Sequence, residues 1–152
     1  GANDESNWRG ILEYFAPLRA WLAEHHAFEA ELYKVGDAKE GSPLMITTNF
    51  SLSYFLVRGE VENSKVPAWL AVMDNEGLSV LTAWAAGKFT ASKIAAFITE
   101  SGVEKNIKNK ELIIPGYVAI LSGALEEKMP GWKITVGPRE ANQLPSFLKG
   151  RA

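Results

Sequence analysis

The residues best suited to binding a ligand lie in a stretch of small side chains with one aromatic ring. In LTAWAAGKFTASK, residues 81–93, an apolar run is followed by alanines, a glycine and the indole of Trp84. Small side chains let the backbone approach a ligand closely, and an indole offers a flat surface for contact. The pattern therefore indicates a platform for a large, flat and mostly apolar group.

The familiar catalytic patterns are not met. A P-loop would need glycine at Thr82 and a hydroxyl residue at Phe89, and no G-x-G-x-x-G follows the first predicted strand. His25 and His26 do not complete H-E-x-x-H, and no histidine or cysteine follows them to activate a serine. We therefore expect no catalytic residue and no metal ligand from the protein, but a site whose cofactor carries the chemistry.

The composition predicts one globular domain. Of 152 residues, 47% are hydrophobic and 22% are charged, with a net charge of -2 and no basic cluster, so nothing favours binding to nucleic acid or an anionic membrane. No run of about 18 apolar residues and no leader-like opening is present, which predicts a soluble protein. The absence of cysteine fits a reducing compartment, and we expect the cytoplasm.

Hydrophobic periodicity predicts the elements that must position the site. Residues 1–33 form a helical N-terminal extension, with apolar residues at spacings of three and four, and residues 34–43 form a linker. Ser51 is expected to cap the first helix of the domain that follows, and DNEG at 74–77 to join two antiparallel strands. The predicted strands are 44–48, 67–74, 78–82, 111–115 and 132–136, and the predicted helices are 52–60, 90–101, 117–129 and 140–149.

This order of elements predicts an α/β fold over residues 44–152. We expect a three-layer, Rossmann-like or flavodoxin-like domain with about five mostly parallel strands and one antiparallel strand. Ligands bind such sheets at the carboxyl ends of the strands. The loops expected at that edge are residues 47–51, 82–89, 115–118 and 137–140. In the last of them, Arg139 and Glu140 either begin a helix as a charge pair or contact a ligand.

Two long segments, 42–98 and 111–141, resemble a known family. From about Tyr33 to the end, the chain is similar to the C-terminal domain of the large subunit of the corrinoid iron–sulfur protein, called the gamma subunit of the acetyl-CoA decarbonylase/synthase complex in methanogens. The resemblance implies a corrinoid-binding methyl carrier of the acetyl-CoA pathway. Its cobalt would accept a methyl group from a methyl-tetrahydropterin and deliver it to acetyl-CoA synthase.

The resemblance also implies the cofactor's state and partners. The family leaves cobalt without a protein ligand, which fits the lack of histidine after His26, so we expect a base-off cobamide. The family's [4Fe-4S] cluster is absent from this chain, because the chain has no cysteine, and the domain is not expected to be a catalyst alone. The implied partners are the small subunit of the corrinoid iron–sulfur protein, the methyl-tetrahydropterin methyltransferase, acetyl-CoA synthase and a reductive activator.

Loop position and resemblance together give the expected cofactor-binding residues, with Thr82 nearest the cobalt. They are Thr48, Asn49, Ser51, Tyr54, Thr82, Ala83, Trp84, Ala85, Gly87, Gly116, Tyr117, Gly137 and Pro138. Two alternatives remain open at this point. The first is a flavodoxin-like flavin-binding domain, and the second is a cofactor-free module that docks a protein at the same edge.

Overall fold

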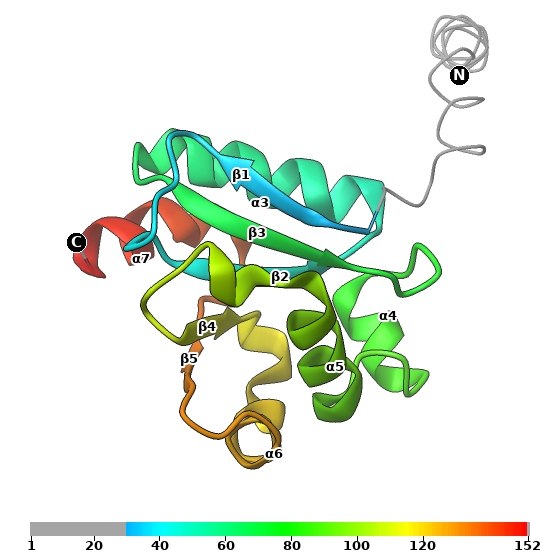
Figure 1. Cartoon of the computed structure of the whole chain (residues 1–152). Helices are drawn as coiled ribbons and strands as arrows, with labels where there is room; N and C mark the ends of the chain where they lie inside the picture. The colour runs from blue at the N-terminus through cyan, green and yellow to red at the C-terminus, as the bar shows by residue number, and fades with distance from the viewer. Residues whose placement is uncertain (1–29, 152) are drawn as a thin grey trace, which may run out of the picture.

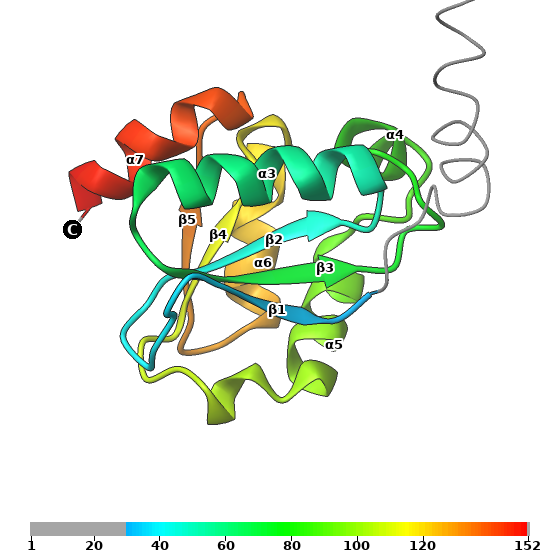
Figure 2. The ribbon, with the colours of Figure 1, turned by 90° about the horizontal axis from the view of Figure 1, so that it is seen from above.

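A five-stranded sheet with helices on both faces forms the structure (Figures 1 and 2). The computed structural model describes residues 30–151. The sheet order is β1–β3–β2–β4–β5, and β1 alone runs antiparallel to its neighbour. The strands are β1 (Leu32–Val35), β2 (Leu44–Thr48), β3 (Ala68–Met73), β4 (Glu111–Ile114) and β5 (Lys133–Val136). The predicted α/β fold with one antiparallel strand is confirmed.

Helices cover the sheet unequally. Helices α3 and α7 pack on one face, and α4, α5 and α6 pack on the other (Figure 1). Short 3-10 turns, η1 to η3, connect several of them. The bounds are α3 (Ser51–Ser64), α4 (Val80–Ala85), α5 (Ala91–Ser101), η1 (Val103–Lys105), η2 (Gly116–Leu121), α6 (Ser122–Lys128), η3 (Ala141–Gln143) and α7 (Leu144–Arg151).

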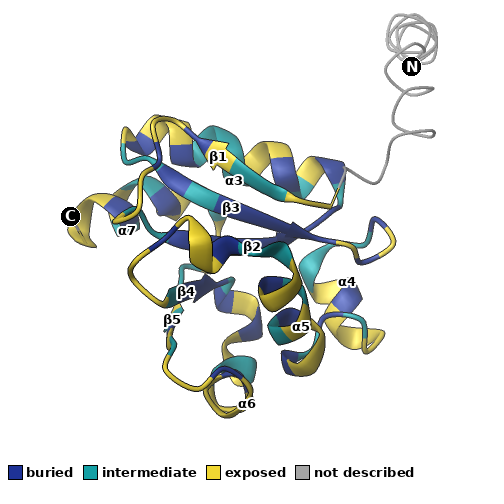
Figure 3. Ribbon diagram, viewed as in Figure 1, coloured by how far each residue is buried: buried dark blue, intermediate teal, exposed yellow. Residues whose placement is uncertain are grey.

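The central strand β2 explains why the sheet forms where it does. All five of its residues are buried, and its side chains alternate between the two apolar cores (Figure 3). Leu44 and Ile46 pack toward α5, whereas Met45 packs toward α3 and α7. A parallel strand covered on both faces has a continuous apolar run, which is the pattern that predicted this strand.

The predicted strand over residues 78–82 is wrong, because this segment turns into helix α4. Glu76 and Gly77 have φ of 58° and 75°, a left-handed turn that lifts the chain off the end of β3. Ser79 then caps α4 by accepting a hydrogen bond from the Thr82 amide. Strand β3 therefore has no hairpin partner after it, and it pairs in parallel with β2 instead.

The antiparallel strand is β1, which comes from residues assigned by sequence to the extension and the linker. It pairs with β3 so that Leu32 lies opposite Ala71 and Val35 lies opposite Ala68. The sheet thus begins before residue 44. The rest of the predicted N-terminal helix, residues 1–29, lies outside the described residues.

Two helix starts also differ from the prediction. Ser51 is the first residue of α3 rather than its cap, and the capping position is Phe50, whose side chain makes no capping bond. The predicted helix over 117–129 begins as the 3-10 turn η2, with a break at Val118, before α6 starts. Within residues 30–151, no helix is both long enough and apolar enough to cross a membrane.

An ion pair at the amino end of the sheet predicts how stability depends on pH. Burial raises the pKa of Glu111, but hydrogen bonds from Arg151 and Thr135, with the charge of Lys133, outweigh it and hold the pKa below its ordinary value. The pKa of Glu111 is thus lower in the folded chain than in the unfolded chain, where it is about 4.3, so the ionised carboxylate stabilises the fold above that pH. This stabilisation is lost as the pH falls through the folded pKa.

Glu111→Gln should therefore lower the midpoint of urea unfolding at pH 7, and the difference from the parent chain should shrink as the pH is lowered toward 3. Glu126→Gln is the control, since this exposed carboxylate on α6 forms no ion pair within residues 30–151. A pH-independent difference between Glu111→Gln and the parent would contradict the assignment.

Candidate functional site

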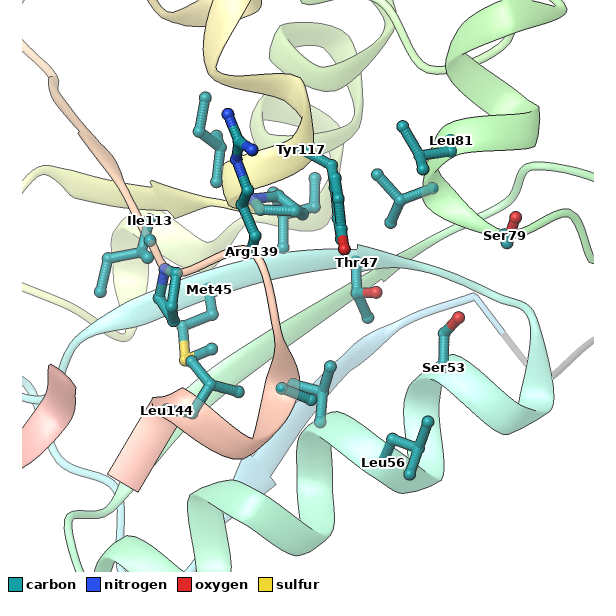
Figure 4. Close-up of a pocket in the computed structure, with 18 residues that line it drawn as sticks. Met45, Thr47, Ser53, Leu56, Ser79, Leu81, Ile113, Tyr117, Arg139 and Leu144 are labelled. Atoms are coloured by element: carbon teal, nitrogen blue, oxygen red, sulfur yellow. The ribbon is translucent and has the colours of Figure 1, made fainter. Parts of the chain in front are cut away.

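A cleft of about 270 Å³ opens at the carboxyl ends of β2 and β4 (Figure 4). Its floor is formed by the strands, and its walls come from α3, from the starts of α4 and η2, and from the segment that runs from the end of β5 through η3 to the start of α7. This is the edge at which open parallel sheets bind ligands. The lining residues are Met45, Ile46, Thr47, Ser53, Leu56, Val57, Ser79, Val80, Leu81, Ile113, Ile114, Pro115, Tyr117, Gly137, Pro138, Arg139, Ala141 and Leu144.

Large apolar side chains remain exposed around the cleft. We call Leu56, Leu81 and Tyr117 the apolar rim: they line the cleft and are 53%, 45% and 42% exposed. The same three elements expose further apolar side chains, namely Leu52, Phe55, Trp84 and Ile120. Exposed apolar surface gathered around a cleft marks a place that a ligand or another protein covers.

Three of the expected cofactor-binding residues, Tyr117, Gly137 and Pro138, line the cleft. Gly116 lies just behind them, where a Cβ atom would come within 2.6 Å of the Gly137 carbonyl oxygen. Glycine is therefore required here for contact between two backbone segments. The loops after β4 and β5 are brought together as the sequence predicted.

The expected residues at the end of β2 and just after it lie inside the protein. Thr48, Asn49, Ser51 and Tyr54 are all at most 4% exposed. The Tyr54 ring packs in the core against Tyr33, and its hydroxyl accepts a hydrogen bond from Arg58. None of these four side chains lines the cleft.

Asn49 has a clear role in positioning. Its Oδ1 accepts hydrogen bonds from the backbone amides of Asn75 and Gly77, at 2.9 and 3.0 Å, and its Nδ2 donates to Asp74 at 3.2 Å. These bonds tie the loop after β2 to the loop after β3. The second loop leads into α4, and so Asn49 helps to hold Ser79 at the cleft.

The expected residues on α4 and after it are divided between core and surface. Ala83 is fully buried, whereas Thr82, Ala85 and Gly87 are exposed and Trp84 is 40% exposed. The Thr82 hydroxyl accepts a hydrogen bond from Ser79 at 2.9 Å. None of these residues lines the cleft, although their neighbours Val80 and Leu81 do.

The cleft wall carries a single charge. Among the described residues that line it, Arg139 alone is ionised, and the others are apolar, hydroxyl-bearing or glycine. Tyr117 donates a hydrogen bond to the carboxylate of Glu140, and this bond raises the pKa of the Tyr117 hydroxyl. Within residues 30–151, no three histidine, cysteine, aspartate or glutamate side chains are grouped so that they could hold a metal ion.

Sequence reasoning missed the wall that α3 contributes. Ser53, Leu56 and Val57 line the cleft, and Leu52 and Phe55 are exposed beside them on the same helix. One available signal was the spacing of Leu52, Phe55 and Leu56, which puts three large apolar residues on one helical face. Only the packing of α3 shows that this face is left uncovered by the rest of residues 30–151.

Fold and cleft define a Rossmann-like α/β domain with a candidate ligand site at the carboxyl edge of its sheet. The chain belongs to the CO dehydrogenase/acetyl-CoA synthase delta subunit family, whose profile matches residues 24–148. This match, together with the relatives that follow, confirms the resemblance to the large subunit of the corrinoid iron–sulfur protein.

Relatives from bacteria and archaea support the assignment. The chain is 42% identical over 144 residues to the corrinoid/iron-sulfur protein large subunit of Moorella thermoacetica, a match covering 90% of this chain and 32% of that protein. It is 39% identical over 122 residues to the acetyl-CoA decarbonylase/synthase complex subunit gamma of Methanothermobacter thermautotrophicus, covering 80% and 26%. The chain thus spans about a third or less of the length of these curated relatives.

Proposed function

We propose that this chain is the corrinoid-binding domain of a methyl carrier. The observation that carries the proposal is an apolar cleft with an apolar rim at the carboxyl edge of the sheet, in a chain 42% identical to a corrinoid/iron-sulfur protein large subunit. When bound, the cofactor's cobalt would accept a methyl group and give it up again. The protein's own part is to bind the cofactor, orient it and keep water from one of its faces.

The size of the cleft indicates which part of the cofactor it could hold. At about 270 Å³ it lies at the lower end of small-molecule sites, and it has room for one heterocyclic group but not for a whole corrinoid. We therefore place the base of the nucleotide tail in the cleft and the corrin ring over the apolar rim. A base held in the cleft is not free to coordinate cobalt, which supports the base-off state.

The residues at the cleft suit these two parts. Leu56, Leu81 and Tyr117 offer exposed apolar surface to the ring, and removing such surface from water favours binding. Residues 30–151 include no histidine, so this part of the chain supplies no imidazole to the metal. Thr82, on the exposed first turn of α4, stays our prediction for the residue nearest the cobalt.

The proposal extends to the methyl donor, the methyl acceptor and a partner subunit. We propose a methyl-tetrahydropterin as the methyl source and acetyl-CoA synthase as the acceptor, with a small subunit covering the apolar surface beyond the cleft. The exposed Trp84 and Ile120 support such a cover, because they lie beyond the cleft lining. We take residues 30–151 as the cofactor-binding unit, since β1 is part of the sheet.

Cofactor loading tests this function. The purified chain is mixed separately with aquacobalamin, cobinamide and FMN, passed through gel filtration, and assayed for cobalt, absorption and flavin fluorescence. We expect cobalt to remain with the protein and the cobalamin spectrum to become that of the base-off form. Retention of flavin without cobalt would support the flavodoxin-like alternative, and retention of neither would overturn the proposal.

Two variants test whether cofactor loading depends on the cleft. Leu56→Glu and Leu81→Glu place a carboxylate in the apolar rim, and we expect each to reduce cobalt retention roughly tenfold or more, because a charge must then be desolvated against an apolar ring. Ala96→Glu adds a carboxylate on the exposed side of α5, outside the cleft, and should retain as much cobalt as the parent chain. Equal loss in all three variants would mean that the cleft is not the site.

A further inference from the structure

An unpaired cation stands in an otherwise uncharged cleft. Arg139 projects from the segment between β5 and η3, near Tyr117 in the same wall (Figure 4). Among residues 30–151, nothing forms a hydrogen bond or an ion pair with its side chain. A cation that a ligand buries in such a place needs an anionic partner, because desolvating an unpaired charge is costly.

The neighbouring acid is already engaged by the protein. The Glu140 carboxylate accepts a hydrogen bond from the Tyr117 hydroxyl and another from the backbone N–H of Gln143, in a capping box at the start of η3. No aspartate or glutamate lines the cleft. The carboxylate next to Arg139 in the chain is thus held at the helix start and forms no ion pair with Arg139.

The backbone that carries Arg139 is held firmly. The Gly137 amide donates to the Ile114 carbonyl at 2.8 Å, and the Gly116 amide donates to the Pro138 carbonyl at 3.1 Å. These bonds fasten the segment before Arg139 to the end of β4. A guanidinium on a fixed backbone loses less freedom when it binds, which favours a specific contact over a general attraction.

We propose that Arg139 binds the phosphodiester of the cofactor's nucleotide tail and so selects corrinoids that carry this group. The proposal rests on the function given above. The side groups of the corrin ring are neutral amides, and the phosphodiester between the ring and the base is the anion of the cofactor. Guanidinium groups pair with phosphate through two parallel hydrogen bonds. Arg139 lines the cleft to which the tail is assigned.

The test compares three corrinoids that differ in the tail: cobinamide, cobinamide phosphate and cobalamin. Their affinities are measured by absorption titration for the parent chain, Arg139→Gln and Arg139→Lys. We expect Arg139→Gln to weaken binding of cobinamide phosphate and cobalamin by roughly ten- to a hundredfold and to leave cobinamide unchanged. Arg139→Lys should restore part of the loss, since it keeps the charge without the second hydrogen bond.

Lys149→Gln, on the exposed side of α7, is the control: it removes one positive charge away from the cleft and should leave the affinity for all three corrinoids unchanged.

The outcomes separate this inference from the proposed function. If the parent chain binds no corrinoid, the proposed function fails and the inference fails with it. If all three corrinoids bind and Arg139→Gln matches the parent, the function stands and Arg139 has no part in recognising phosphate. An equal loss for all three corrinoids would also overturn the inference, because the side chain would then act on the ring or on the fold.

Discussion

Asn49→Ala is expected to lower the free energy of unfolding by roughly 2–5 kcal/mol, because two buried amides lose their acceptor. The Asn49 side chain, only 4% exposed, accepts the Asn75 and Gly77 amides. Alanine provides no acceptor, and each buried N–H left unsatisfied costs about 1–3 kcal/mol. Urea unfolding followed by tryptophan fluorescence measures the change.

A matched variant separates the network from the residue type. Asn109→Ala removes the same side chain from an exposed position, where it donates one long hydrogen bond of 3.5 Å to the Gly41 carbonyl. We expect its free energy of unfolding to change by less than about 0.5 kcal/mol. Equal unfolding midpoints for the two variants would show that the bonds of Asn49 contribute nothing beyond those of a surface asparagine.

Gly116→Ala is the second large effect that we expect. The added Cβ would lie 2.6 Å from the Gly137 oxygen, 2.7 Å from the Arg139 nitrogen and 2.8 Å from the Pro138 carbonyl carbon. All three are backbone atoms, so no side chain can rotate away to make room. The loops after β4 and β5 must separate, which should cost about 1–3 kcal/mol of stability or more and weaken corrinoid binding at the cleft.

The control for Gly116 predicts a change of opposite sign. Gly123 lies inside α6, and a Cβ there meets nothing within 4 Å. Gly123→Ala should therefore stabilise the protein by about 0.4–1 kcal/mol, because alanine restricts the unfolded chain. Thermal unfolding of both variants checks the pair. A Gly116→Ala protein as stable as the parent would mean that the two loops move apart at little cost.

The fold was predictable where burial alone decides the structure. Strands β2, β3 and β4 were found as apolar runs, because a strand covered on both faces needs apolar residues at nearly every position. Strand β5 lies at the edge of the sheet and buries only Ile134, but its WKITV run has strand composition and was also found. Strand β1 was missed, because its four residues lie where the helical spacing of apolar residues in the extension gives way to the glycine-containing stretch that was read as a linker. The segment 78–82 has strand-like composition, yet the cap at Ser79 and the left-handed turn before it direct it into a helix.

The site was predictable in position more than in detail. Loop position correctly brought Tyr117, Gly137 and Pro138 to one cleft, because the carboxyl ends of parallel strands must meet at one edge. The polar residues after β2 offered groups that a ligand could use, but the turn into α3 buries them. The sequence alone does not show whether Asn49 faces a ligand or the interior of the protein. Only the folded chain shows that the acceptor of Asn49 is already occupied by two amides.

The cleft also has a consequence for how the protein is made. Its walls come from residues as far apart as Met45 and Leu144, and the final wall follows β5. During translation, a nascent chain that has formed only β2, α3 and β3 lacks the surfaces around Ile113 and Arg139. The proposed cofactor site is therefore complete only after nearly all of this segment has left the ribosome.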